Sequence, residues 1–243
     1  MVVCSSCGAT NRDGARFCDS CAAPLTDVVP RREVRKTVTV FFCDVSGSTA
    51  LGERIDPESL RAVMARYFDL AKTTLERHGG TVEKFIGDAV MAVFGVPAVH
   101  EDDALRALRA AEELREGLGP LNDELERSYG ARLELRIGVN TGEVVTGTEE
   151  RIATGDAVNV AARLEQAAPP GEVLVGEETL RLVRGAVEVE PAEPVAAKGK
   201  ADPLTAYRLV AVRAATRPRR AGTPMVGRER QRKLLEDAFA NVV

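Results

Sequence analysis

Residues 37–45 read TVTVFFCDV, an apolar run that is rich in Val, Phe and Thr and carries one acid, Asp44, near its end. Short runs of this kind are typical of a strand buried on both faces. A small, polar stretch follows, and residues 58–78 then place apolar side chains at helical spacing until Gly79 and Gly80 end the pattern. The stretch therefore predicts a buried strand, a tight turn and a long amphipathic helix.

The next segments extend this unit on its C-terminal side. TVEKFI (81–86) and AVMAVFG (89–95) both favour strands, and Gly87-Asp88 between them is typical of a two-residue hairpin turn. Residues 102–127 predict a second long helix, and residues 131–147, ARLELRIGVNTGEVVTG, predict a strand with a turn around positions 140–142. The order β-α-β-β-α-β indicates a ferredoxin-like α+β fold, with helices over one face of a largely antiparallel sheet.

Further elements follow this unit, and we expect them to belong to the same domain, residues 37–213. Residues 157–168 predict a third helix, which Pro169-Pro170-Gly171 ends. Three more strands are predicted, at residues 171–176, around 187–190, and at 204–212. Residues 214–243 begin as a basic, Pro-containing stretch without aromatic residues, which predicts a solvated linker rather than a nucleic-acid surface.

The first 26 residues predict a separate zinc ribbon. Their four cysteines form two CxxC pairs on either side of residues 8–17: Cys4, Cys7, Cys18 and Cys21. Two such pairs on tight turns can close a tetrahedron around Zn²⁺, and four thiolates leave no open position, so we expect a structural site. Residues 27–36 are predicted to be a linker. The fifth cysteine, Cys43, lies in the apolar run and is expected to be buried.

The bulk composition indicates a soluble globular protein. The chain has 243 residues, of which 44% are hydrophobic and 29% charged, with a net charge of −4. This balance gives no electrostatic reason to expect nucleic-acid or membrane binding and disfavours a nucleic-acid-binding role for the ribbon. There is no apolar run of about 18 residues and no secretory signal, so we expect a cytoplasmic protein.

Two acids are expected to lie at one end of the sheet. Asp44 comes near the end of the first strand, and Asp88 sits at the tip of the predicted hairpin. Either acid alone would be interpreted as a turn former. If the first strand lies beside the hairpin, however, the two carboxylates meet, and a pair of hard oxygen ligands suits Mg²⁺ or Mn²⁺.

Five segments, in the same order along the chain, resemble the catalytic domain of class III adenylate and guanylate cyclases. They are FFCDVSGSTAL, HGGTVEKFIGDAVMAVFG, LRIGVNTGEVVTG, GDAVNVAARLEQA and the late KGK, and together they cover about residues 37–212. The resemblance implies attack of the ribose 3′-hydroxyl of ATP on the α-phosphate, which releases cyclic AMP and pyrophosphate. It also implies that Asp44 and Asp88 bind two metal ions, Mg²⁺ or Mn²⁺, in each active site.

The resemblance further assigns roles to single residues. Lys84 matches the lysine with which adenylate cyclases read the adenine edge, where guanylate cyclases have glutamate. Asn159 and Arg163, four apart on one helix face, match the ribose-orienting asparagine and the transition-state arginine. Arg136 resembles an arginine that contacts the triphosphate, and Lys198 resembles the late phosphate-binding lysine.

One position departs from the family pattern. The family places a polar base-reading residue seven positions before the asparagine, and this chain has Ile152, which cannot form a hydrogen bond. Discrimination between adenine and guanine is therefore expected to be loose, unless Thr154 replaces the missing contact. Ile152 also favours a second interpretation, in which a catalytically weak cyclase-like domain senses nucleotide or dimerises for a larger regulator.

The resemblance also implies partners. In the family the metal-binding aspartates of one chain face the lysine, asparagine and arginine of another, and this domain carries both sets, so we expect a homodimer with shared sites. Residues 225–231, MVGRERQ, resemble the opening of the ATPase modules that often follow such domains, and no GxxxxGK[ST] motif comes after them. We therefore expect the truncated start of such a module, and a longer regulator.

Overall fold

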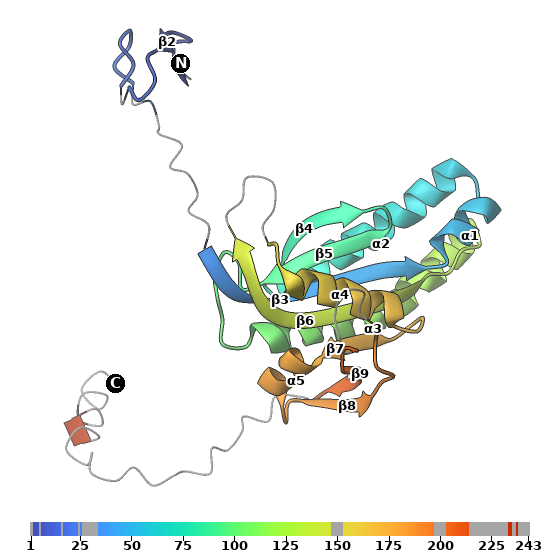
Figure 1. Ribbon diagram of the computed structural model, residues 1–243. Coiled ribbons are helices and arrows are strands. Elements are labelled where there is room, and N and C mark those ends of the chain that lie inside the picture. The colour runs from blue at the N-terminus through green and yellow to red at the C-terminus, as the bar shows by residue number, and fades with distance from the viewer. Residues whose placement is uncertain are drawn as a thin grey trace. The chain divides into compact units, whose positions relative to one another are not determined.

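The computed structural model describes residues 2–4, 6–15, 17–23, 25, 34–146, 153–196 and 203–213, together with Lys233, Leu234 and Asp237. These residues form an N-terminal module and a central domain, each of which is described by itself (Figure 1). Most of residues 213–243, which form a separate unit, lie outside this set, as does nearly all of the predicted start of an ATPase module. Within the described residues, no helix has both the length and the apolar character needed to cross a bilayer.

A seven-stranded sheet forms the centre of the domain, with the strand order β4-β5-β3-β6-β7-β9-β8. The strands are β3 (Val34–Ser46), β4 (Thr81–Ile86), β5 (Ala89–Phe94), β6 (Glu134–Thr146), β7 (Val173–Gly176), β8 (Val187–Pro191) and β9 (Ala206–Val212). Neighbouring strands are antiparallel except for the pair β6 and β7. The hairpin turn at Gly87-Asp88 is confirmed, because β4 ends at Ile86 and β5 begins at Ala89.

Five helices accompany the sheet in the described part of the domain. They are α1 (Ser48–Arg54), α2 (Pro57–Arg77), α3 (Asp103–Tyr129), α4 (Asp156–Ala167) and α5 (Glu177–Val183). The start of α2 follows from its sequence, because the Asp56 side chain accepts a hydrogen bond from the Ser59 amide and Pro57 occupies the first turn. The end of α3 follows from Gly130, whose φ of 62° is left-handed.

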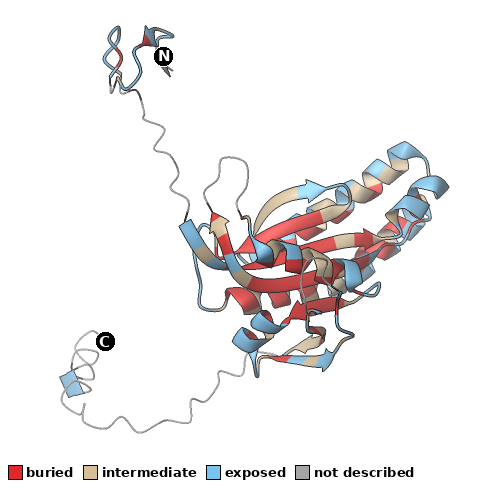
Figure 2. Ribbon diagram, viewed as in Figure 1, coloured by how far each residue is buried: buried red, intermediate tan, exposed pale blue. Residues whose placement is uncertain are grey.

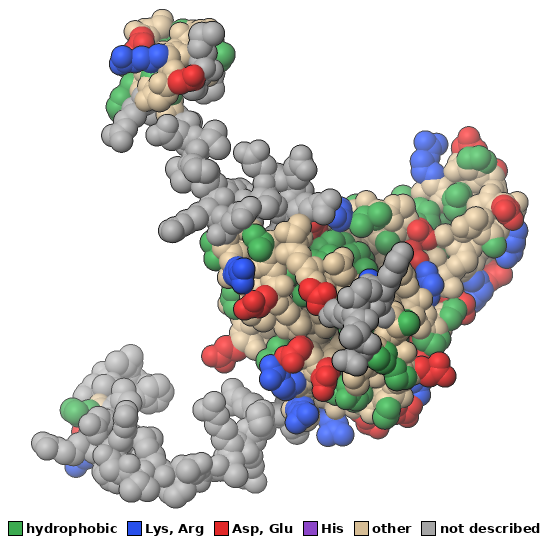
Figure 3. All heavy atoms as spheres, viewed as in Figure 1, with side chains coloured by type: hydrophobic (Ala, Val, Ile, Leu, Met, Phe, Trp, Pro, Cys, Tyr) green, Lys and Arg blue, Asp and Glu red, His purple; other side chains and the backbone are tan. Residues whose placement is uncertain are grey.

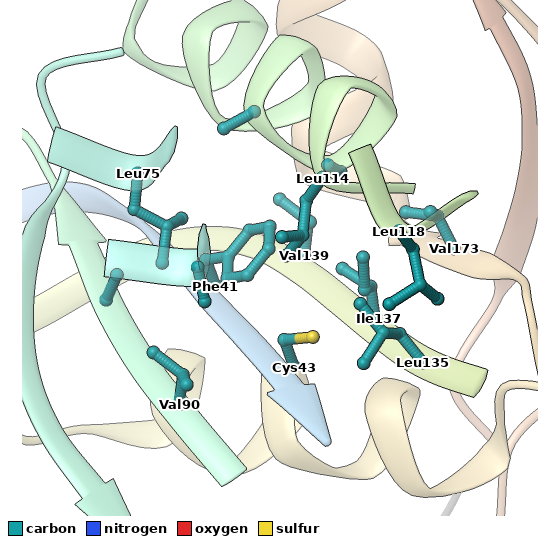
Figure 4. Close-up of a cluster of buried hydrophobic side chains, with 14 of the residues drawn as sticks. Phe41, Cys43, Leu75, Val90, Leu114, Leu118, Leu135, Ile137, Val139 and Val173 are labelled. Atoms are coloured by element: carbon teal, nitrogen blue, oxygen red, sulfur yellow. The ribbon is translucent and has the colours of Figure 1, made fainter. Parts of the chain in front are cut away.

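The unit β3-α2-β4-β5-α3-β6 confirms the ferredoxin-like order. Helices α2 and α3 pack on one face of the sheet, where Phe41, Leu75 and Leu114 meet in the main apolar core (Figure 4). Buried residues follow the strands and the inner sides of these helices, while exposed residues gather on their outer sides (Figure 2). Cys43 lies in this core and is fully buried, as predicted.

Helix α4, one of the elements added to this unit, covers the opposite face. It crosses strands β3 and β6, with α2 and α3 on the far side of the sheet (Figure 1). Its buried residues Ala157 and Ala161 pack with Val38 and Val40 of β3 in a second apolar cluster. Alternation along β3 therefore divides the strand: the odd positions from Phe41 to Val45 face α2 and α3, and the even positions, Asp44 included, face α4.

The turn predicted around positions 140–142 is wrong. Strand β6 runs through these positions without a break, with Asn140 paired to Val40 and Gly142 paired to Val38. Both residues serve the packing of α4 instead. The Asn140 amide donates to the Ala157 carbonyl at 3.3 Å, and a Cβ on Gly142 would lie 2.9 Å from the Ala157 Cβ. Asn and Gly, which favour turns in isolation, are here required by a helix that lies close to the strand.

The domain also begins earlier than predicted. Residues 34–36, assigned to the linker from the sequence, form the start of β3 and pair with the end of β6, where Val34 lies opposite Thr146. This start is charged and exposed, so no apolar pattern marks it as a strand. Its partner strand determines its conformation, because β6 offers a continuous row of backbone hydrogen-bonding groups to pair with.

Candidate active site

The two acids predicted to bind metal lie at the same end of the sheet. Asp44 is near the end of β3, and Asp88 occupies the turn between β4 and the neighbouring strand β5. The register pairs Cys43 with Val90, so that the turn lies at the level of Asp44. Burial raises the pKa of Asp44; the Arg136 guanidinium opposes this effect, and the negative charge of Asp88 adds to it. The two carboxylates are therefore close enough to repel each other.

This arrangement fits a divalent cation. Two carboxylates supply hard oxygen ligands, and their mutual repulsion would be relieved by positive charge between them. The one cationic side chain that is hydrogen-bonded to Asp44 in the described residues is Arg136, on the adjacent strand β6, whose Nη2 donates to Asp44 Oδ2 at 2.5 Å. Arg136, which the resemblance directs to the triphosphate, here neutralises one of the acids.

A third acid, Glu165, was missed by the sequence analysis. It lies on α4, its side chain is 6% exposed, and its Oε1 is 3.4 Å from Arg136 Nη2. The Glu165 pKa is raised to about 7, mainly by burial and next by the negative charge of Asp44. The only sequence signal was its position next to the core residue Leu164, on a part of the helix that is expected to face the sheet.

Close packing of α4 against β6 brings Glu165 to this position. A Cβ on Gly138 would lie 2.3 Å from both the Ala161 carbonyl oxygen and the Glu165 amide nitrogen. Glycine therefore lets the helix backbone rest directly on the strand. Gly138 is two positions from Arg136 and faces the same side of the sheet, which explains why Glu165 is in reach of the guanidinium.

The predicted catalytic pair lies on the solvent side of α4. Asn159 is exposed and Arg163 is half-buried, while Val160 and Leu164 face the core as predicted. Arg163 lines a hollow of about 570 Å³ together with residues of β7, β9 and the chain after β8. Residues 191–196 form one side of this hollow, and the described chain stops two residues before Lys198.

The base-reading positions are described only in part. Lys84 lies on β4 with its side chain 39% exposed and its Nζ 3.9 Å from Glu83 Oε1. Ile152 and Lys198 lie outside the described residues. Thr154, the alternative to Ile152, donates from its hydroxyl to the Val145 carbonyl at 3.3 Å, and its backbone pairs with the same residue.

The N-terminal module gathers all four of its cysteines. Their sulfur atoms lie within 4.8 Å of one another, with Cys4 3.6 Å from Cys21 and Cys7 3.5 Å from Cys18. Backbone N–H groups of Cys21 and Ser20 lower the pKa of Cys18 to about 6, which favours the thiolate that metals bind. Four sulfur ligands in one cluster fit a closed zinc site.

The small sheet of this module joins β1 (Val2–Val3) to β2 (Thr10–Asn11). The chain turns after the first CxxC pair at Gly8, whose φ is 73°.

The surface of the central domain carries charges of both signs. Acidic and basic side chains are interspersed over the face drawn in Figure 3, in keeping with the small net charge of the chain.

The N-terminal module and the central domain are each similar to a known protein family. Residues 31–211 match the family described as the adenylate and guanylate cyclase catalytic domain, and residues 3–25 match the zinc-ribbon domain. Adenylate cyclase 1 of Rhizobium meliloti (strain 1021) is 32% identical over 197 residues, which are 78% of this chain and 30% of that protein. The match to the adenylate cyclase of Anabaena cylindrica covers 27% of that protein, so this chain spans about a third or less of these relatives.

Two solved structures are similar over most of the described domain. The adenylyl cyclase CyaB from P. aeruginosa has a TM-score of 0.71 and 32% sequence identity, covering 74% of this chain and 97% of that one. The guanylyl cyclase Cya2 has the same TM-score and 31% identity, covering 76% and 97%. The family match, the shared fold and the paired acids agree: the chain belongs to the adenylate and guanylate cyclase catalytic domain family and carries a zinc-ribbon domain ahead of that domain.

Proposed function

We propose that this chain is an adenylate cyclase that converts ATP to cyclic AMP and pyrophosphate for intracellular signalling in the cytoplasm. The observation that carries the proposal is the pair Asp44 and Asp88, two carboxylates that lie at the same end of the sheet, at the end of β3 and in the turn before the neighbouring strand β5. Lys84 favours adenine over guanine, and the relatives from Rhizobium and Anabaena are named adenylate cyclases. The family match supports a nucleoside triphosphate as substrate.

Asp44 and Asp88 would hold two divalent cations, Mg²⁺ or Mn²⁺. When bound, such ions lower the pKa of an attacking hydroxyl and offset the charge of a triphosphate. Asp44 is 15% exposed, so its carboxylate lies at the base of the site rather than in open water. A partly buried carboxylate attracts a cation more strongly than an exposed one, because water screens the charges less.

The other residues of the site would bind and orient the nucleotide. Lys84 would donate to the adenine edge, and Asn159 would orient the ribose. Arg163 would stabilise the charge that builds on the phosphate oxygens as the bond to pyrophosphate breaks. Arg136 and Lys198 would contact the triphosphate.

We further propose that the active sites form between two copies of the chain. Asn159 and Arg163 lie on the solvent side of α4, whereas Asp44 lies near the end of β3, on the face of the sheet that α4 covers. A two-fold dimer would place the first set of one subunit opposite the acids of the other. The zinc ribbon would be structural, and a downstream ATPase module would belong to a longer regulator.

The first test measures cyclic nucleotide formed from ATP and from GTP with Mn²⁺. We expect activity with ATP and a loss of about a thousandfold in Asp44→Ala, the scale of losing a main electrostatic contribution to catalysis. Asp69→Ala, an exposed acid on α2, is the matched control and should keep full activity. Equal turnover in wild type and Asp44→Ala would instead support the second candidate, a nucleotide-sensing module, which Ile152 favours.

The dimer proposal predicts recovery when two inactive variants are mixed. Asp44→Ala and Arg163→Ala each destroy one half of every site, but a mixed dimer keeps one intact site. Random exchange would make half of the dimers mixed, so about a quarter of wild-type activity is expected. Mixing two preparations of the same variant is the control, and no recovery in the mixture would contradict shared sites.

A further inference from the structure

Two buried polar atoms beside the acid pair lack hydrogen-bond partners within the described residues. One is a donor, Arg136 Nε, and the other is an acceptor, Glu165 Oε1. They belong to side chains already in contact, since Glu165 Oε1 lies 3.4 Å from Arg136 Nη2. Buried polar atoms without partners are costly and uncommon. A donor and an acceptor left open on neighbouring side chains indicate that the guanidinium has a second position available.

The present position of Arg136 is determined by Asp44. The guanidinium donates to Asp44 Oδ2 at 2.5 Å and keeps a longer contact with Glu165. If cations bind Asp44, the positive charge beside Arg136 increases, and the Asp44 carboxylate no longer accepts the hydrogen bond from the guanidinium. Because the Arg136 side chain is only 27% exposed, water replaces this acceptor poorly. The guanidinium then needs another carboxylate nearby.

Glu165 cannot move away from Arg136 easily. Its amide nitrogen and Cα are two of the three backbone atoms of α4 that lie against Gly138, so the helix at this point rests on the strand. Its side chain is 6% exposed, and its Oε1 lies 3.4 Å from Arg136 Nη2 on β6. A carboxylate on such a backbone acts as a stationary acceptor, toward which a long arginine side chain can turn.

We propose that Glu165 is a positioning residue that receives Arg136 when cations occupy Asp44, and so keeps the guanidinium beside the triphosphate. The inference rests on the proposed function, because it takes Asp44 as a cation ligand. In the metal-free protein Arg136 is shared between two carboxylates. In the loaded protein Glu165 holds it alone, and both open hydrogen-bonding atoms gain partners. Without Glu165, cations bound to Asp44 would leave Arg136 without a carboxylate partner in its own chain, and cation binding would be weaker.

The test measures Mn²⁺ binding to the full, zinc-loaded chain by calorimetry in the presence of a non-reactive methylene analogue of ATP. Glu165→Gln keeps the shape of the side chain and removes its charge. We expect the Mn²⁺ dissociation constant to rise about tenfold, the effect of losing one hydrogen bond to a charged group. Glu124→Gln, which breaks an exposed ion pair with Arg66, is the matched control and should bind Mn²⁺ as wild type does.

A double-mutant cycle separates positioning from a loss of packing. Glu165→Gln in an Arg136→Ala background should cause no further weakening, because the residue to be held is absent. A tenfold loss in both backgrounds would overturn the proposal, as would unchanged binding in Glu165→Gln alone. Melting of the metal-free variants, followed by circular dichroism, verifies that each of them folds.

The same measurement distinguishes failure of this inference from failure of the proposed function. Asp44→Ala should weaken Mn²⁺ binding far more than Glu165→Gln does. If Asp44→Ala binds Mn²⁺ like wild type, the assignment of the metal site is wrong. If Asp44→Ala binds weakly while Glu165→Gln binds normally, the metal site stands and only the role of Glu165 is wrong.

Discussion

The zinc ribbon and the cyclase domain are stabilised in different ways, although both are predicted to bind metal. The described core of the ribbon consists of Cys4, Cys18 and Leu25, two of which are metal-ligand candidates. The core of the domain is a continuous apolar cluster between the sheet and helices α2 and α3. A module this small cannot bury enough apolar surface to fold alone, whereas the domain can. Metal should therefore determine folding in the first and chemistry in the second.

Removal of zinc should give the largest effect. A strong chelator is expected to unfold residues 2–25 completely, because structural zinc contributes about 10 kcal/mol or more to such modules. The central domain should melt at an unchanged temperature, since its core contains no metal ligand from this cluster. Cys18→Ser should reproduce the effect without chelator. Amide exchange read by mass spectrometry reports the two parts separately, and protection of residues 2–25 that survives chelation would contradict the comparison.

Gly138→Ala should have the second largest effect, and it should be confined to the cyclase domain. The added methyl group would meet two backbone atoms of α4 at 2.3 Å, which cannot move without displacing the helix. We expect a loss of about 3 kcal/mol in the free energy of unfolding, measured by urea denaturation followed by circular dichroism.

Gly119→Ala is the matched control for this substitution. Gly119 lies within α3, and a Cβ there meets nothing within 4 Å. Alanine is the better helix former, but position 119 precedes Pro120, whose ring opposes a helical residue with a Cβ, so this variant should stay within about 1 kcal/mol of wild type. Equal behaviour of the two variants would show that the backbone of α4 does not rest on β6.

His78 should give the smallest effect, through the pH dependence of the domain's stability. Burial, followed by the charges of Arg77, Arg109 and Arg106, lowers its pKa below the usual 6.5, although Glu113 lies 2.7 Å away. Burial and the three arginines outweigh Glu113, because Arg77 shares the same carboxylate. The unfolded chain then takes up a proton near pH 6.5 that the folded domain resists, so stability is retained above this pH and falls below it.

The measurement compares melting temperatures at pH 7.5 and pH 5.5. His78→Gln should remove part of the acid-induced decrease, a change of about 2 °C for a domain of this size. Only the main melting transition, that of the central domain, is followed, so that unfolding of the ribbon does not contribute to the melting temperature. A larger decrease in His78→Gln than in wild type would mean that the pair with Glu113 dominates and that the His78 pKa is raised rather than lowered.

Local patterns were sufficient for the ferredoxin-like order but not for everything around it. The helices at 57–77 and 103–129 and the turn at Gly87-Asp88 follow from spacing and turn chemistry that neighbouring residues carry. Asn140 and Gly142 favour a turn by the same local rules, and the prediction failed because pairing with β3 and packing against α4 impose a continuous strand. Tertiary packing overrides local preference where a residue is buried between two elements.

The candidate site likewise depends partly on local sequence motifs and partly on tertiary packing. Motifs along the chain are enough to identify the residues expected to carry the chemistry: Asp44, Asp88, Lys84, Asn159 and Arg163, together with four cysteines in pairs of metal-binding spacing. Which charges meet is visible only in the folded domain. The contact of Arg136 with Asp44 and Glu165 joins residues from β3, β6 and α4, and it exists because a glycine lets the helix lie on the sheet. Charges interact through space, and their distances are fixed by packing rather than by order along the chain.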